Sequence, residues 1–226
     1  MTSVIDSEAV PGGRRITRML SMDRTLTIPD SVDGDMVVSI GPSFLSGSPG
    51  TGSRTLVIPA SVTEIDPCAL DGTMGISTIE YGGELTVFEG FKLLNSDDCT
   101  LRCIHEGRRF EFDFIADTPM SFPEFDDAVL SLYMRLTPEI ALKRLSDPVG
   151  LTEENRARYE RFVSDRIMPR AEQAISNSDR GSLKQLFDSG MISDEDLRKL
   201  LERSLRSGRV GMTSTIMSEI RRRTIG

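Results

Sequence analysis

Apolar and polar residues alternate in short bursts over the first half of the chain, and this alternation is typical of strands joined by turns. Four bursts share a pair of apolar residues two positions apart: Leu26 and Ile28, Leu56 and Ile58, Ile79 and Tyr81, and Leu101 and Cys103. Because successive side chains of a strand point to opposite faces, each pair lies on one side of its strand. The pattern predicts four successive rungs of a sheet.

One phrase occurs at both of the first two rungs. Residues 26–32 read Leu-Thr-Ile-Pro-Asp-Ser-Val, and residues 56–62 read Leu-Val-Ile-Pro-Ala-Ser-Val. The likeness continues at Ile40 and Ile65, each followed five and seven residues later by a leucine and a glycine. A repeat of this size cannot bury its apolar side alone and needs stacked neighbours, so the phrase predicts a β-solenoid.

The two clear repeats differ in length. Asp33–Ser39 stand where the second repeat has only Thr63 and Glu64, and a polar loop, Gly47–Arg54, precedes the second strand. Insertions of this kind leave a solenoid from one face and can shape a binding surface. Neutral length variation is the alternative interpretation.

The repeated phrase resembles the leucine-rich repeats of the BspA-like, or Treponema pallidum, type. Residues 27–32 and 58–65 match the core phrase of that family's repeat. Where the family has Ala-Phe, this chain has Phe44-Leu45 and Ala69-Leu70. Two good repeats and two degraded ones cover about residues 20–105. The resemblance implies a leucine-rich-repeat fold and a role in protein binding, often in adhesion at cell surfaces.

From Pro123 onward the hydrophobic period becomes helical. Helix start and stop signals stand at Thr137, Thr152, Ser193, Gly190 and Gly208. Pro169 either kinks a helix or begins the next one. Residues 178–223 are similar to ankyrin-type helix pairs, although the Thr-Pro-Leu-His phrase of those repeats is absent.

These patterns together predict an α+β protein with two domains. Residues 1–118 are expected to form a short, irregular leucine-rich-repeat β-solenoid, and residues 119–226 an all-helical domain. The helical domain is a candidate cap for the open end of the solenoid, since a terminal rung exposes apolar surface that needs a cover.

The charge distribution changes near the same boundary. The net charge is −8, but residues 1–130 hold 21 acidic and 9 basic side chains, against 14 and 18 in the remainder. The acidic half would be repelled by nucleic acid and by anionic membranes, whereas the basic half can attract an acidic partner or dock against its own neighbour. We therefore expect neither a nucleic-acid nor a membrane partner.

The compartment is suggested by the amino terminus and by the cysteines. Residues 1–13 have neither the basic leader nor the apolar run of a secretory signal, and no stretch approaches the roughly 18 apolar residues of a membrane span. Cys68, Cys99 and Cys103 are odd in number, which agrees with a reducing compartment. We expect a cytoplasmic protein.

The chain has a single histidine, His105, close to Cys99 and Cys103. A Cys-x-x-x-Cys-x-His string could hold zinc or form a Cys/His nucleophile pair. The alternation places all three on the same side as Leu101, which favours the core, and a structural zinc site needs four ligands. A metal-binding protein or an enzyme using Cys99, Cys103 and His105 is therefore kept as an alternative.

A second alternative is polyanion or nucleic-acid binding by the last helices. Their basic residues are Arg198, Lys199, Arg203, Arg206, Arg209 and Arg221–Arg223. No aromatic residues are interleaved, so stacked bases would have no platform. Arginines near a helix C-terminus also favour the helix through its dipole.

No constellation of residues indicates a reaction. The architecture therefore favours a non-enzymatic protein–protein interaction module without a cofactor or a metal, which binds an unidentified protein partner. Parity along the predicted strands places Thr27, Val57, Glu80 and Arg102 on the face away from the core. We predict these four residues as the partner-binding surface.

Overall fold

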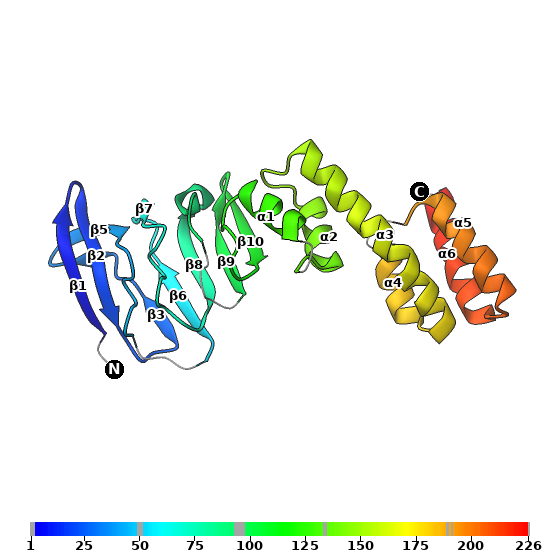
Figure 1. Ribbon diagram of the computed structural model, residues 1–226, viewed down its shortest axis with the longest axis horizontal. Helices are drawn as coiled ribbons and strands as arrows, with labels where there is room; N and C mark the ends of the chain where they lie inside the picture. The colour runs from blue at the N-terminus through cyan, green and yellow to red at the C-terminus, as the bar shows by residue number, and fades with distance from the viewer. Residues whose placement is uncertain are drawn as a thin grey trace. The chain divides into compact units, whose positions relative to one another are not determined.

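The computed structural model describes residues 3–48, 52–92, 98–132, 135–188, 190 and 192–225. It divides into two compact units, Met1–Arg135 and Leu136–Gly226. A β-solenoid-like region of about four turns is followed along the chain by helices, which confirms the α+β fold class (Figure 1).

The strands of the first unit form two five-stranded sheets. They are β1 (Val4–Val10), β2 (Gly13–Leu20), β3 (Thr25–Thr27), β4 (Ser31–Val32), β5 (Asp35–Ile40), β6 (Arg54–Ile58), β7 (Glu64–Ile65), β8 (Ile76–Glu84), β9 (Cys99–His105) and β10 (Arg108–Phe114). The main sheet has the order β10-β9-β8-β6-β3. The second sheet has the order β1-β2-β5-β4, with β7 paired to β5.

The four predicted rungs are neighbouring parallel strands, β3, β6, β8 and β9, which lie side by side in Figure 1. Leu26 lies opposite Leu56, Leu56 opposite Ile79, and Ile79 opposite Leu101. Each of these side chains is at most 1% exposed. The repeated apolar position therefore becomes one continuous buried column, as the alternation predicted.

The additional residues of the first repeat build part of the second sheet. Asp33 and Gly34 have positive φ angles, 55° and 90°, and form the turn between the antiparallel strands β4 and β5. β5 then pairs in parallel with β2 and with β7. Residues 33–39 thus supply a turn and a strand instead of a free loop. Residues 49–51 of the Gly47–Arg54 loop lie outside the described residues.

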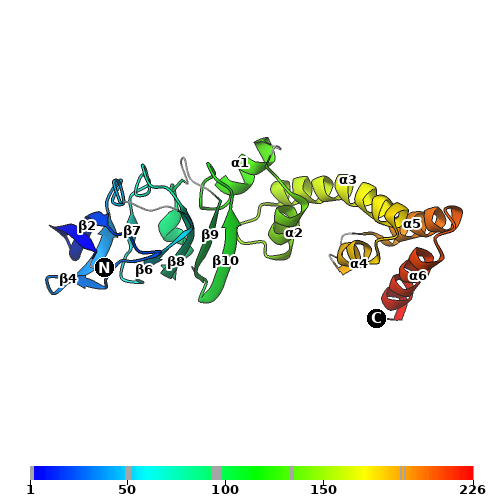
Figure 2. The ribbon, with the colours of Figure 1, turned by 90° about the horizontal axis from the view of Figure 1, so that it is seen from below.

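Helix α1 (Glu124–Leu132) follows β10 and belongs to the first unit, although the sequence analysis grouped residues 119–226 together. A cluster of aromatic rings explains why α1 belongs to the first unit. The ring of Phe125 lies 5.1 Å from Phe112 and 5.2 Å from Phe114, and the ring of Phe122 lies 5.4 Å from Phe112. Burying these rings holds α1 beside β10, as Figure 2 shows. A short 3₁₀ helix, η1 (Leu85–Phe88), follows β8 in the same unit.

The second unit contains α2 (Pro138–Ser146), α3 (Glu153–Asn177), α4 (Arg180–Asp188), α5 (Asp194–Arg206) and α6 (Val210–Ile225). The predicted starts are confirmed, because the side chains of Thr137, Thr152 and Ser193 each accept a backbone N–H of the first turn. Pro169 lies inside α3 and does not end it.

The helices of the second unit pack as neighbouring pairs. α3 contacts α2, α4 and α5, while α6 contacts α4 and α5. Within the described residues, no helix combines the length and the apolar character needed to cross a membrane.

Candidate functional site

A row of outward-facing side chains crosses the main sheet. Thr27, Val57, Glu80 and Arg102 are successive register partners on β3, β6, β8 and β9, and Glu111 of β10 follows Arg102. Thr27, Arg102 and Glu111 are exposed, whereas Val57 and Glu80 are partly exposed. The structure therefore places the four residues predicted from parity side by side, and we call these five residues the outward row.

Within this row Arg102 joins three strands, β8, β9 and β10. Its Nη1 donates to Glu80 Oε1 at 3.1 Å, and its Nε donates to Glu111 Oε2 at 3.1 Å. The hydrogen bond to Glu111 and then that to Glu80 raise the pKa of Arg102 above its ordinary value. One guanidinium is thus shared by two carboxylates.

A row of hydroxyl groups, which was not predicted from the sequence, runs beside the outward row. Thr25, Thr55, Thr78 and Thr100 are successive register partners on the same four strands. Thr100 Oγ1 donates to Asp113 Oδ1 on β10 at 2.6 Å. The signal in the sequence is a threonine two positions before each of the four outward-row residues on these strands, Thr27, Val57, Glu80 and Arg102.

A groove of about 730 Å³ lies at the carboxyl-terminal ends of β6, β8 and β9. It is lined by Val57, Ile58, Pro59, Glu80, Tyr81, Gly82, Arg102, Cys103, Ile104, Arg109, Phe110 and Glu111. Four members of the outward row form part of this lining. The groove therefore extends the predicted contact surface along the strands.

The shape of the groove depends on Gly82, which lies between the chain segments that carry Pro59 and Ile104. A Cβ added at Gly82 would lie 3.0 Å from the backbone nitrogen of Ala60, a distance that requires the neighbouring chain to move. The missing side chain thus lets the turn after β6 approach β8 closely. Pro59 and Ile104, both partly exposed, provide apolar walls.

Arg109 also lines the groove but differs from Arg102 in its pairing. Its side chain is exposed, and it lies opposite Ile104 in the β9–β10 hairpin. Among the residues that the structure describes, it forms no ion pair. Arg109 is therefore the unpaired cation of the groove, and it lies beside the trio of Glu80, Arg102 and Glu111, which carries one net negative charge.

Cys99, Cys103 and His105 lie on one side of β9, and the two thiols point into the core, as the alternation predicted. Cys99 is 1% exposed and Cys103 5%. Burial raises the pKa of each thiol to about 12, so both stay protonated at neutral pH, which disfavours metal ligation and nucleophilic attack. The His105 ring is partly buried, 6.2 Å from that of Phe110. Within the described residues, no three His, Cys, Asp or Glu side chains are grouped to hold a metal ion.

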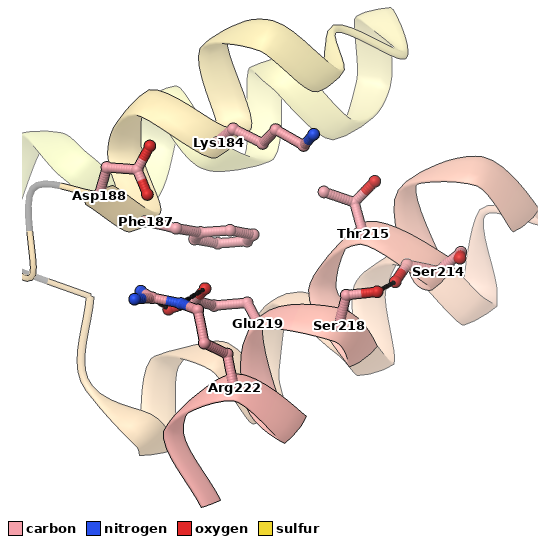
Figure 3. Close-up of a pocket in the computed structure, with 8 residues that line it drawn as sticks. All are labelled: Lys184, Phe187, Asp188, Ser214, Thr215, Ser218, Glu219 and Arg222. Atoms are coloured by element: carbon pink, nitrogen blue, oxygen red, sulfur yellow. Dashed lines mark hydrogen bonds and ion pairs between the residues drawn. The ribbon is translucent and has the colours of Figure 1, made fainter. Parts of the chain in front are cut away.

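A second hollow, of about 470 Å³, lies between α4 and α6 in the second unit (Figure 3). It is lined by Lys184, Phe187, Asp188, Ser214, Thr215, Ser218, Glu219 and Arg222. Arg222 donates twice to Glu219 at 2.8 Å, and the hydroxyls of Thr215 and Ser218 donate to carbonyls of their own helix. These donors are already engaged, and the carboxylates of Asp188 and Glu219 offset the charge of Lys184, so the hollow is poorly suited to an anion.

The basic residues of the last helices are mostly paired with carboxylates. The pairs are Lys199 with Glu195 and Asp196, Arg203 with Glu172, Arg206 with Glu202, and Arg222 and Arg223 with Glu219. In the part of the chain that the structure describes, Arg198, Arg209 and Arg221 have no ion pair, although Arg209 donates to the Ser178 hydroxyl at 2.9 Å. The charge available to a polyanion is therefore smaller than the sequence suggests.

The outward row and its groove are the strongest candidate site, because they combine aligned polar groups, partly exposed apolar walls and an unpaired cation on one sheet. Comparison with known proteins adds nothing to this assignment. The chain matches no family model, no curated protein and no solved structure.

Proposed function

We propose that this chain is a non-enzymatic protein-interaction module whose contact surface is the outward row with its adjoining groove. The observation that carries the proposal is the register of Thr27, Val57, Glu80 and Arg102, which sets them side by side on neighbouring strands. Stacked repeats characteristically offer such continuous surfaces to partners.

The composition of the surface supports the same role. Specific interfaces combine an apolar centre with a polar rim that sets the orientation of the partner. Here Val57, Pro59 and Ile104 are partly exposed, and Glu80, Arg102 and Glu111 line the same groove. The proposal assigns no reaction and no cofactor to the chain.

Two further parts of the proposal concern family and compartment. We propose that the main sheet is a short array of BspA-like leucine-rich repeats, which the recurrence of Ile-Pro-x-Ser-Val at residues 28–32 and 58–62 supports. We also propose a cytoplasmic location, which agrees with three free cysteines.

The test is affinity capture from a lysate of the native host, with the whole chain as bait and mass spectrometry of the retained proteins. The test variant combines Thr27→Ala, Glu80→Ala and Arg102→Ala. We expect a stoichiometric protein that the wild type retains and the variant does not. Retention of the same proteins by the variant would contradict the proposal.

The matched control lies on the second sheet. Arg15 is placed between Glu8 and Glu64 there, with its Nη2 3.4 Å from Glu64 Oε1, much as Arg102 is placed between Glu80 and Glu111. The double variant Arg15→Ala and Glu64→Ala also removes one arginine and one carboxylate from a sheet surface. It should retain the partner as the wild type does.

A further inference from the structure

We propose that the groove binds an extended segment of a partner protein that carries a carboxylate next to an apolar side chain. This inference rests on the proposed function, because it names the chemistry of the partner at the same surface. It is carried by two features of the groove, its apolar walls and the unequal pairing of its two arginines.

The space above Gly82 has apolar walls. Val57, Pro59 and Ile104 surround this position, and each of them is partly exposed. A leucine, isoleucine or valine side chain placed there removes apolar surface of both partners from water, which favours binding. The apolar residue of the segment is therefore assigned to this hollow.

The two arginines of the groove, Arg102 and Arg109, differ in their pairing. Arg102 is held by Glu80 and Glu111 at 3.1 Å each, so an incoming cation would have to compete with its guanidinium for either carboxylate. Arg109 forms no ion pair with the described residues, so an incoming carboxylate can pair with it without breaking a contact. The other acidic groups of the unit are screened beyond about 8 Å at physiological ionic strength.

The dimensions indicate a short segment. The lining residues come from β6, β8, β9 and β10, and strands are about 4.8 Å apart, so the groove spans roughly 14 Å across the sheet. An extended chain advances about 3.3 Å per residue, so about four residues fill this width. β6, β8 and β9 are paired on both sides, so the segment lies on their side chains and does not add a strand.

The experiment is a selection from a displayed library of random short peptides, with the full chain as bait. Selected peptides are then measured against wild type, Arg109→Glu and the control Arg108→Glu. Arg108 is the preceding residue of β10, is also exposed, and points to the other side of the strand. The two substitutions therefore make the same charge change at adjacent positions on opposite faces.

We expect the selected peptides to carry Asp or Glu within two residues of a Leu, Ile, Val or Phe. Arg109→Glu should weaken their binding about fivefold, because it removes an exposed ion pair worth up to about 1 kcal/mol and adds a repelling carboxylate, while Arg108→Glu leaves it unchanged. A further variant, Val57→Lys, fills the apolar hollow with a charged side chain and should abolish binding. Circular dichroism of each variant verifies that it is folded.

The other outcomes separate the inference from the function on which it rests. The carboxylate assignment is overturned if the selected peptides lack an acidic residue. It is also overturned if they bind Arg109→Glu as tightly as wild type but do not bind Val57→Lys. Either result leaves the contact surface in place. The inference is overturned if the peptides bind Val57→Lys as tightly as wild type, or if the selection enriches no peptide. These two results also contradict the proposal that the groove is a contact surface.

Discussion

The guanidinium of Arg102 lies 3.1 Å from the carboxylate of Glu80, and the two residues are register partners on the parallel strands β8 and β9. They meet because they occupy the same place in successive rungs. One position earlier on the same strands, Ile79 and Leu101 meet in the core. The contact surface and the buried column are therefore two faces of one repeat.

The buried column predicts that the same substitution changes the free energy of unfolding very differently at two adjacent positions. Leu56, 1% exposed, lies between Leu26 and Ile79, so Leu56→Asp buries an unpaired charge and should lower the free energy of unfolding of the first unit by about 4 kcal/mol or more. Val57→Asp, on the outward face, should cost roughly 1 kcal/mol or less. Urea unfolding followed by circular dichroism measures both, and equal losses would contradict the assigned register.

The aromatic cluster predicts that α1 stabilises the first unit. Phe125 is fully buried against Phe112 and Phe114, so Phe125→Ala should lower the free energy of unfolding by about 3 kcal/mol. Phe125→Leu keeps much of the apolar volume and should cost less. If neither change affects unfolding of the strands, followed by their circular dichroism, then α1 is not part of this core.

Glu219 predicts a pH dependence in the second unit. Its carboxylate, 7% exposed, accepts hydrogen bonds from Arg222 and Arg223, which lower its pKa from 4.5 to about 2. Because the folded-state pKa is below the unfolded one, this stabilisation is present above about pH 4.5 and is lost as the pH falls toward 2. Glu219→Gln should therefore lower the free energy of unfolding at neutral pH, by about 2 kcal/mol.

The measurement is urea unfolding at neutral pH and at several acidic values. Wild type should lose more stability than Glu219→Gln between about pH 5 and 2, so their difference narrows on acidification. Glu202→Gln provides the control, because the pair of Glu202 with Arg206 is long, 3.7 Å, and exposed. The free energy of unfolding of Glu202→Gln should depend on pH as that of wild type does. The same pH dependence in all three proteins would refute the role of Glu219.

The cysteines predict a difference in labelling. Cys68 is exposed, whereas Cys99 and Cys103 are buried with a pKa of about 12. A maleimide at neutral pH should modify Cys68 in the folded protein and the other two only after unfolding, because the thiolate is the reactive form. Cys68→Ser should then show no native labelling in intact-mass spectra. Three equal labelling rates would contradict the placement of β9.

The cap at the start of α5 predicts a modest loss of stability when its side chain is removed. The Ser193 hydroxyl accepts the backbone N–H of Asp196 at 3.1 Å. Ser193→Ala removes this acceptor and should lower the free energy of unfolding of the second unit by about 1 kcal/mol, whereas Ser193→Asn keeps an acceptor and should cost little. Thermal and urea unfolding compare the two, and equal stability of both variants would exclude a capping role.

Much of this fold can be predicted from local patterns in the sequence. Alternation at Leu26, Leu56, Ile79 and Leu101 specifies which side of each strand is buried, because the side-chain period of a strand is two. Once these positions stack, parity also specifies the outward row. The capping residues of the helices act within one turn, so their roles are likewise local.

Other features depend on contacts between residues that are distant along the chain. The β1–β2 hairpin carries no repeat signal, and it becomes part of a sheet only because β2 pairs with β5. Nothing local indicates that Phe125 joins Phe112 instead of the later helices. The boundary between the units therefore follows from packing and could not be read from the change in hydrophobic period.

The groove also depends on contacts between residues that are distant along the chain. Its hollow exists because Gly82 lies near Pro59 and Ile104, which belong to three different rungs. Whether Arg102 or Arg109 is left unpaired depends on which carboxylates reach each guanidinium across the sheet. Alternation determines the face on which a side chain lies, whereas only long-range pairing determines its neighbours, and binding chemistry depends on those neighbours.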